Sequence, residues 1–442
     1  MTLGGRRTYV GFGFGAIQAG LFLYEAFQSG RFGRLVVAEV LPDMVAAVRQ
    51  DHGFFHVNIA HAEGVEQATI GPIQIENPGQ AADRERLIEA IAAAEEIGTA
   101  VPSVNHYVST GNGSLHRLLA EGLIHKAHTG GPRAVIYAAE NDNYAAEILE
   151  ARVFEAIPAP EHDAVHAQVR FLNTVIGKMS GVLAGTDDLN AAGVLPLTTG
   201  SDRVFLVEAF NRILISRIDF GPASPPFERG ITVFEEKARL LPFEEAKLYG
   251  HNATHALAAY IGAVMGIERI ADLRHMPDMI AFLRAAFLEE SGEALIRKYR
   301  GADPLFTPAG YAAYADDLLE RMTNPYLRDT VERVGRDPQR KLGWNDRLIG
   351  TMRLALQQGI APTRYALGAA AGLAVLRGTS LAEISDPDAT LDALWHESAP
   401  DTAERERVIA HIRTALACLR DWSAAGFPPL EPFLAAFVRR SG

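Results

Sequence analysis

The chain has 442 residues, 48% of them hydrophobic, and a formal net charge of −12 at pH 7. This length and apolar content predict two packed cores and exclude a disordered chain. The negative net charge argues against general binding to nucleic acid or to an anionic membrane, because such partners bind to broad basic surfaces. No stretch approaches the roughly 20 uninterrupted apolar residues of a membrane span, and the N-terminus lacks a signal-peptide pattern. The expected location is therefore the cytoplasm.

Strand-like and helix-like segments alternate in the first half of the chain, which predicts parallel strands joined by helical crossovers. The expected elements, in chain order, are a strand at 9–10, a helix at 16–27, a strand at 35–40, a helix at 82–96, an extended segment at 98–101 and a strand at 134–138. Two β-rich pieces, at 56–59 and 69–75, look like a hairpin insertion. The predicted fold class of this half is α/β.

From Phe243 onward, apolar residues mostly recur at helical spacing, which predicts a second half that is nearly all helix. Between the halves, residues 203–218 alternate like strands, and residues 219–230 are rich in proline and glycine. The boundary is therefore expected between 189 and 242. We divide the chain into an N-terminal domain at 1–200 and a mostly helical domain at 201–442.

Glycines cluster where the first strand turns into the first helix, an arrangement that lets backbone N–H groups approach a pyrophosphate. Two registers fit the nucleotide-binding pattern. Gly11, Gly13 and Ala16 form G-x-G-x-x-A, whereas Gly13 and Gly15 followed by Gly20 form a shifted variant. A plain tight turn is the alternative explanation, but the position between a strand and a helix favours a Rossmann-type nucleotide site.

Glu39 lies near the end of the second predicted strand, where a carboxylate can accept hydrogen bonds from the adenosine ribose hydroxyls. The same carboxylate would repel the extra phosphate of NADP. The predicted cofactor is therefore NAD. The alternative is a solvated acid at a strand end.

Lys247, Asn252 and His255 share a helix-like segment at the spacing K-x4-N-x2-H. At about 100° per residue, Asn252 lies about 140° and His255 about 80° from Lys247, so the three can line one side of a cleft. A desolvated lysine with a depressed pKa can take the hydroxyl proton in a metal-free alcohol dehydrogenase. Amides of Asn252 and Asn141 would stabilise the developing alkoxide, and His255 would hold a neighbouring hydroxyl. The alternative is a set of capping and surface residues.

Further along the chain, four basic residues crowd into nine positions: Arg333, Arg336, Arg340 and Lys341. Gly335 and Pro338 between them predict a turn rather than one continuous helical face. Guanidinium groups pair bidentately with phosphate oxygens, so this turn can clamp a phosphate. A solvated basic turn, balanced by Glu332 and Asp337, explains the cluster equally well.

Three ordered blocks of sequence resemble the polyol-specific long-chain dehydrogenases, the mannitol dehydrogenase family. They are Asn324-Pro-Tyr-Leu-Arg-Asp-Thr-Val-Glu-Arg-Val-Gly-Arg336, Arg340-Lys-Leu-Gly-Trp-Asn-Asp-Arg-Leu-Ile349 and Phe287-Leu-Glu-Glu-Ser-Gly-Glu-Ala-Leu-Ile296. The resemblance implies a Rossmann-type domain followed by a helical domain, and metal-independent hydride transfer between NAD and a linear polyol or ketose.

The resemblance also implies roles for individual residues. It places the base at Lys247, the amide donors at Asn141 and Asn252, and the substrate-orienting residue at His255. The remaining implied positions are substrate contacts at Arg333 and Lys341, and a glycine loop with Gly13, Gly15, Ile17 and Gly20.

The chain departs from the family pattern after a predicted strand, where Gly177 and Lys178 replace an Asp-Arg pair. The missing carboxylate puts the identity of the polyol in question. The leading expectation is conversion of mannitol 1-phosphate to fructose 6-phosphate with NAD. The alternatives are a free polyol such as mannitol or arabinitol, a hexuronate, and a catalytically silent protein that senses NAD.

Overall fold

The computed structural model describes residues 7–184, 193–398 and 400–441. The chain divides into two compact units, Met1–Leu241 and Pro242–Gly442. The break thus lies at 241, within the expected interval of 189–242 but after the division drawn at residue 200, because strands that follow residue 200 pair with strands of the first unit. Part of the predicted boundary interval, 189–192, lies outside the described residues.

A mixed eight-stranded sheet forms the centre of the first unit, in the order β12-β11-β8-β7-β6-β1-β2-β5. Its strands are β1 Arg7–Phe12, β2 Phe32–Ala38, β5 Gln74–Glu76, β6 Glu96–Thr99, β7 Ala134–Ala138, β8 Val169–Ile176, β11 Ile213–Ser216 and β12 Phe234–Lys237. The run from β5 to β8 is parallel throughout. Its order is that of a doubly wound nucleotide-binding sheet, with the switch point between β1 and β6.

A smaller four-stranded sheet has the order β4-β3-β10-β9. Its strands are β3 Phe55–Ala60, β4 Val65–Ile70, β9 Ser180–Ala184 and β10 Arg203–Glu208. The predicted hairpin is present as the antiparallel pair β3 and β4. The β-rich piece expected at 69–75 is two strands, however, because Gly71 and Pro72 interrupt it and Pro72 has no amide hydrogen for a ladder. Its second part, β5, belongs to the main sheet.

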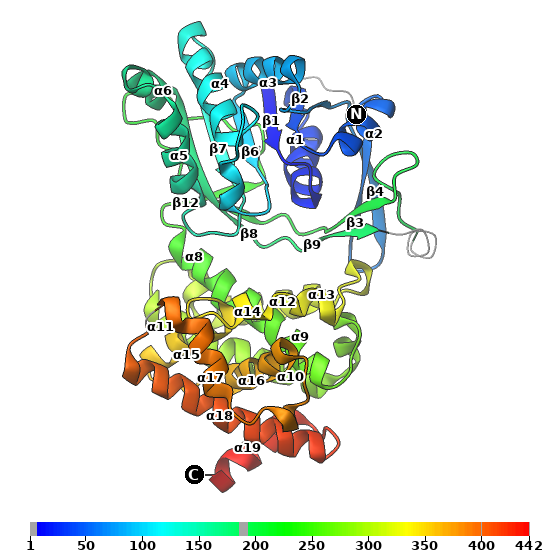
Figure 1. Cartoon of the computed structure of the whole chain (residues 1–442), viewed down its shortest axis with the longest axis vertical. Helices are drawn as coiled ribbons and strands as arrows, with labels where there is room; N and C mark the ends of the chain where they lie inside the picture. The colour runs from blue at the N-terminus through cyan, green and yellow to red at the C-terminus, as the bar shows by residue number, and fades with distance from the viewer. Residues whose placement is uncertain (1–6, 185–192, 399, 442) are drawn as a thin grey trace. The chain divides into compact units, whose positions relative to one another are not determined.

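Helices cover the main sheet of the first unit (Figure 1). They are η1 Gln18–Leu23, α1 Tyr24–Gln28, α2 Pro42–Gln50, α3 Ala81–Ala93, η2 Val104–Tyr107, α4 Leu115–Thr129, α5 Ala145–Ala156, η3 Ala159–Glu161 and α6 His162–Gln168. Because side chains alternate along a strand, Tyr9 and Val10 of β1 enter two different cores. The core around Val10 includes residues of α3, α4 and α5.

The second unit is helical, as the sequence predicts. Its first helices are α8 Leu241–Glu245, η4 Ala246–Asn252, α9 Ala253–Val264, η5 Ile270–His275, α10 Pro277–Ala285, η6 Ala286–Gly292, α11 Glu293–Lys298, η7 Pro304–Phe306 and α12 Pro308–Met322. The rest are η8 Pro325–Leu327, α13 Val331–Gly335, α14 Pro338–Lys341, α15 Arg347–Gln357, α16 Thr363–Arg377, η9 Leu381–Glu383, α17 Pro387–Trp395, η10 His396–Ser398, α18 Thr402–Ala424 and α19 Leu430–Ser441.

Helices α9 and α16 lie at the core of the second unit, and most of their residues are buried. They approach closely where α16 carries glycines. A Cβ at Gly368 would lie 2.8 Å from Leu257, and one at Gly372 would lie 3.0 Å from Tyr260. This packing fixes α9, the helix that carries His255. The expected class, a Rossmann-type α/β unit followed by a mostly helical unit, is confirmed.

Candidate active site

The glycine loop of the first unit lies at the carboxyl end of β1. Gly13 has a φ of +80° and donates its N–H to the carbonyl of Ala38 over 2.9 Å. A Cβ at this position would lie 2.8 Å from the carbonyl oxygen of Ala100, so a side chain is excluded both by conformation and by space. Glycine is therefore required where the chain turns from β1 toward the helix.

The other residues of the loop divide into packed and accessible positions. Ala16 and Gly20 are buried, and a Cβ at Gly20 would lie 2.5 Å from Val207. Gly15 and Ile17 are partly exposed, and a Cβ at Gly15 would meet no atom within 4 Å. Of the predicted cofactor residues here, Gly13, Gly15 and Ile17 are accessible to a ligand, whereas Ala16 and Gly20 pack the helix.

Glu39 joins the ends of β1 and β2. Its carboxylate accepts a hydrogen bond from the N–H of Phe14 over 2.7 Å and another from the N–H of Leu41 over 2.9 Å. The side chain is 6% exposed, and each carboxylate oxygen can still accept a further bond. A carboxylate beside a sharp glycine turn, at the carboxyl edge of a doubly wound sheet, is a fitting arrangement for a dinucleotide.

Asn141 follows β7 and is exposed. The preceding residue, Glu140, is buried and accepts hydrogen bonds from the Thr99 hydroxyl and the Val101 N–H. This carboxylate therefore links the chain after β7 to the end of β6 and fixes the backbone from which Asn141 projects.

The pair that departs from the family pattern, Gly177 and Lys178, follows β8. The Lys178 ammonium is buried and donates to the carbonyl of Phe210 over 3.0 Å and to Oδ1 of Asn211 over 2.7 Å. It thus ties the end of β8 to the chain before β11.

In the second unit, Lys247 and Asn252 belong to η4, a π-helical turn rather than the regular α-helix assumed for their spacing. In a π-helix, hydrogen bonds join residues five apart, and these two residues are five apart, so Asn252 lies one turn above Lys247. Both side chains are partly buried. Burial, with a smaller effect from the charge of Arg347, lowers the pKa of Lys247 to about 8, while Glu244 opposes the change.

His255 lies one turn further along, on α9, and faces Asp329. Its Nε2 is 4.0 Å from Oδ2 of Asp329, and the other oxygen of Asp329 pairs with the Arg333 guanidinium. Burial and the cations Arg333, Arg347 and Lys341 lower the pKa of His255 to about 3. The imidazole is therefore neutral at physiological pH, so it can bind a hydroxyl but cannot act as an acid.

The four clustered basic residues do not share one environment. Lys341 is buried, its Nζ donates to the carbonyl of Arg336, and burial lowers its pKa to about 8. Arg333 is partly buried beside Asp329. Arg336 and Arg340 are exposed, and Arg340 pairs with Asp337 over 2.8 Å. The structure thus brings Arg333 and Lys341 close to His255 and leaves Arg336 and Arg340 at the surface.

Arg347 belongs to the candidate site, although no pattern in the sequence singles it out. It is 9% exposed, its Nε donates to Oδ1 of Asp346 over 2.8 Å, and its charge lowers the pKa of Lys247, His255 and Lys341. Its helix, α15, packs tightly on η4. The Thr351 hydroxyl donates to the carbonyl of Tyr249 over 3.0 Å. Arg347 lies within a block that carries the family resemblance, but nothing in the sequence indicates that it is buried.

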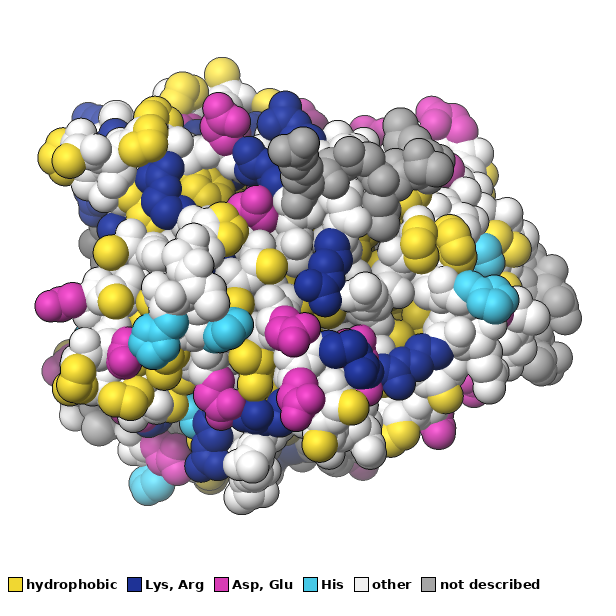
Figure 2. All heavy atoms as spheres, turned by 90° about the horizontal axis from the view of Figure 1, so that it is seen from above, with side chains coloured by type: hydrophobic (Ala, Val, Ile, Leu, Met, Phe, Trp, Pro, Cys, Tyr) yellow, Lys and Arg dark blue, Asp and Glu magenta, His cyan; other side chains and the backbone are white. Residues whose placement is uncertain are grey.

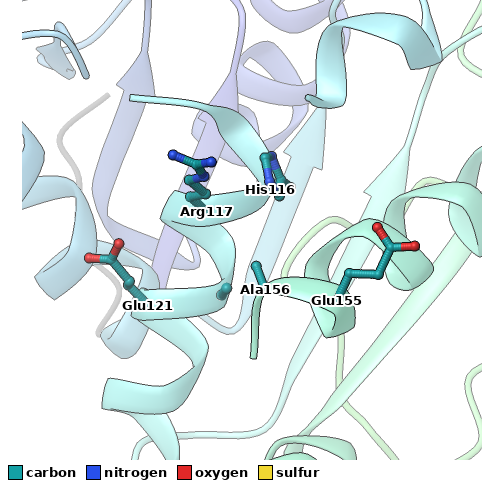
Figure 3. A pocket seen from close by; sticks show the side chains of 6 residues that line it. His116, Arg117, Glu121, Glu155 and Ala156 are labelled. Carbon is teal, nitrogen blue, oxygen red and sulfur yellow. The ribbon is translucent and has the colours of Figure 1, made fainter. Parts of the chain in front are cut away.

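A cavity of about 350 Å³ lies between α4 and α5 of the first unit and is lined by His116, Arg117, Ala120, Glu121, Glu155 and Ala156. Figure 3 shows these side chains on the two helices. The imidazole Nδ1 of His116 lies 2.8 Å from the Ser114 hydroxyl oxygen. The cavity contains none of the predicted site residues.

Within 7–184, 193–398 and 400–441, no group of three or more His, Cys, Asp or Glu is placed to hold a metal ion. None of the helices in those ranges is long and apolar enough to cross a membrane. Figure 2 shows basic and acidic side chains interspersed on one face of the molecule.

Comparison with known proteins supports the resemblance seen in the sequence. A family model described as the mannitol dehydrogenase C-terminal domain matches residues 239–415. A mannitol-1-phosphate 5-dehydrogenase of Bacillus licheniformis is 31% identical over 339 residues, which cover 76% of this chain and 80% of that relative.

Two solved structures share the fold. One is a Pseudomonas fluorescens mannitol 2-dehydrogenase in a ternary complex with NAD and D-mannitol, with a TM-score of 0.69, 17% identity and coverage of 99% of this chain and 96% of that chain. The other is a D-sorbitol dehydrogenase in substrate-free form, with a TM-score of 0.72, 14% identity and coverage of 97% and 95%. By sequence identity over most of its length, the chain belongs to the mannitol dehydrogenase family of oxidoreductases.

Proposed function

We propose that this protein interconverts mannitol 1-phosphate and fructose 6-phosphate with NAD, and that Lys247 is the general base. One observation carries the proposal: a lysine of lowered pKa, a neutral histidine and partly or fully buried cations lie near one another in the second unit. The chain that holds them belongs to the mannitol dehydrogenase family. A pKa near the working pH suits a group that must both accept and return a proton.

The cofactor residues that we propose lie in the first unit. The N–H groups of the loop through Gly13, Gly15 and Ile17 would bind the pyrophosphate, and the Glu39 carboxylate would accept hydrogen bonds from the adenosine ribose. The chemistry that NAD supplies when bound is acceptance of a hydride from the substrate carbon. Ala16 and Gly20 would act by holding the helix in place.

Lys247 takes up the hydroxyl proton as the carbinol carbon is oxidised, and in reduction the protonated lysine returns that proton to the carbonyl oxygen. Asn252, one π-turn above, donates its amide to the same oxygen and stabilises its developing negative charge. His255 holds a neighbouring hydroxyl. The role of Asn141 as a second amide donor rests on the family resemblance alone, because it belongs to the other unit.

The substrate phosphate would be bound by the basic turn. Arg333 and Lys341, which are partly or fully buried near His255, are proposed as direct substrate contacts. Arg336 is exposed, but its charge lowers the pKa of both residues, and it is proposed to bind the phosphate from the surface. Arg340 is already paired with Asp337, so we expect it to contribute least. A cluster of cations is the local feature that an anionic substrate needs in a chain with a net charge of −12.

The test is NADH oxidation by the purified full-length protein with fructose 6-phosphate, fructose and tagaturonate. The proposal expects the highest kcat/KM with fructose 6-phosphate. A higher value with fructose or tagaturonate would instead assign a free polyol or a hexuronate. In Lys247→Ala we expect turnover to fall by about a thousandfold or more while NADH still binds. Unchanged turnover in that variant would exclude Lys247 as the base.

The phosphate contacts are tested by comparing two neighbouring arginines. Arg336→Ala should raise KM for fructose 6-phosphate by about tenfold and leave KM for fructose nearly unchanged, because a single guanidinium–phosphate contact is lost. Arg340→Ala, whose side chain is already paired with Asp337, should change KM for fructose 6-phosphate much less. Equal effects of Arg336→Ala on both sugars would contradict the phosphate assignment.

A further inference from the structure

Asp329 is a buried carboxylate with one oxygen satisfied and one not. The side chain is 4% exposed, and Oδ1 pairs with the Arg333 guanidinium. Oδ2 has no hydrogen-bond partner among the described residues, and neither has Nε2 of His255, which lies 4.0 Å away. Two unsatisfied polar atoms of complementary character thus face each other at a distance too long for a direct hydrogen bond.

The 4.0 Å separation of these two atoms matches a bridge by one hydroxyl oxygen. Two hydrogen bonds of about 2.8 Å span 4.0 Å when they meet at roughly 90° on a shared oxygen. A small rotation of either side chain brings that angle closer to tetrahedral. A buried polar atom without a hydrogen-bond partner is unfavourable in free energy. A ligand that bonds to both atoms therefore gains binding free energy from the two hydrogen bonds and from removal of this penalty.

The charges around the pair select a hydroxyl over other groups. His255 is neutral, because burial and the cations Arg333, Arg347 and Lys341 lower its pKa to about 3. A neutral imidazole can present an N–H at Nε2, whereas an ionised carboxylate only accepts. A hydroxyl can accept from His255 and donate to Asp329, but a phosphate or carboxylate oxygen would meet Asp329 with like charge.

We propose that Asp329 is a substrate-binding residue that accepts a hydrogen bond from the same polyol hydroxyl to which His255 donates, while its other oxygen holds Arg333 in place. This inference rests on the proposed function, because it requires a polyol or ketose in the site. It gives the chain a carboxylate contact to a substrate hydroxyl, although the acid of the Asp-Arg pair is replaced by Gly177.

The inference is tested with substrate analogues that each lack one hydroxyl, assayed on the full-length protein. In the wild type, removal of the hydroxyl held by His255 and Asp329 should lower kcat/KM by about ten- to hundredfold. In Asp329→Asn, that penalty should shrink to about threefold or less for the same analogue and stay unchanged for the others. The matched control is Asp337→Asn, since Asp337 also pairs with an arginine but is half exposed; it should keep the wild-type pattern.

The outcomes separate this inference from its alternatives. If Asp329→Asn lowers kcat/KM equally for every analogue, Asp329 acts only by holding Arg333, and the inference fails. If Asp329→Asn does not fold, His255→Gln is tested instead. In that variant, the change in the kcat/KM penalty must occur for the analogue that lacks the same hydroxyl. Absence of turnover with every polyol and ketose in the wild type would overturn the proposed function, and this inference with it.

Discussion

The chemistry proposed for Lys247 depends on the residues around it. A lysine in water has a pKa near 10.4, so almost none of it is neutral at pH 7. Burial lowers the pKa of Lys247 to about 8, and the charge of Arg347 acts in the same direction. On the proposed mechanism, polyol oxidation needs the neutral amine, so its kcat/KM should rise with pH up to about 8 and then level off. Ketose reduction needs the ammonium form and should decline above that pH.

Arg347→Met tests this dependence. Removal of a nearby positive charge favours protonation of Lys247, so the midpoint of the pH profile for oxidation should move upward by about half a pH unit or more. The other charged group that acts on the lysine, Glu244, is unchanged in this variant, and the nearby His251 is neutral because burial lowers its pKa well below the usual value. Arg347→Lys restores the positive charge and should return the midpoint toward the wild-type value.

The control is Arg297→Met, because Arg297 is a solvent-exposed arginine that pairs with Glu293 within α11. It should leave the pH profile unaltered. If Arg347→Met lowers kcat without moving the midpoint, Arg347 supports the structure of the site and does not tune the lysine. Coincident profiles for all three variants would show that the charge of Arg347 does not affect the pKa of Lys247.

At the residue scale, the sequence indicated which side chains can perform the chemistry but not which of them are turned inward. Arg333, Arg336, Arg340 and Lys341 are equivalent as a cluster of charges in the sequence, yet only Arg333 and Lys341 lie near His255. Asp329 and Arg347 lie in the blocks that carry the family resemblance, but no motif or spacing in the sequence marks them as site residues. Their burial results from tertiary packing, which no local pattern reveals.

At the scale of elements, the segment around Lys247 shows where periodicity was insufficient. The apolar pattern correctly predicted a helix, and the offset of about 140° between Lys247 and Asn252 followed from regular α-helical geometry. The segment is instead a π-helical turn, which requires one extra residue per turn. The packing of Tyr249 against Gly350, where a Cβ would lie 2.5 Å from the ring, belongs to the tertiary structure and could not be inferred from spacing.

The glycine loop allows a test at the scale of one element. Gly15→Ala adds a methyl group where no atom lies within 4 Å, so stability should change by no more than about 0.5 kcal/mol. If the loop approaches a pyrophosphate closely, the same methyl group should raise the Kd for NADH by about tenfold.

Gly20→Ala should behave in the opposite way. Its added methyl group would lie 2.5 Å from Val207 and 3.2 Å from Val57, so overpacking should destabilise the protein by about 1–3 kcal/mol. The Kd for NADH, measured by fluorescence titration below the melting transition, should change less than in Gly15→Ala. Loss of NADH binding in Gly20→Ala with no change in stability would contradict the division of the loop into accessible and packed positions.

At the scale of the whole molecule, the alternation of strands and helices followed by helical spacing predicted both classes of unit. The boundary was harder to place because residues 203–218 are strands by pattern, and a pattern does not say which sheet a strand joins. In the structure, β10 completes the small sheet and β11 extends the large one. The net charge of −12 likewise does not indicate the cations around His255, because a sum over 442 residues hides a local cluster.

The division into units predicts where NADH should stabilise the protein. A ligand present at 100 times its Kd stabilises the state that binds it by about 2.7 kcal/mol. The proposed cofactor residues all lie in the first unit. Hydrogen exchange of the full chain with NADH should therefore slow most at the glycine loop and at residues 39–41. NADPH at the same concentration should protect these amides less, because the Glu39 carboxylate would face its extra phosphate. Equal protection by both dinucleotides would mean that Glu39 does not select the cofactor, and protection confined to residues 246–264 would place the cofactor site elsewhere.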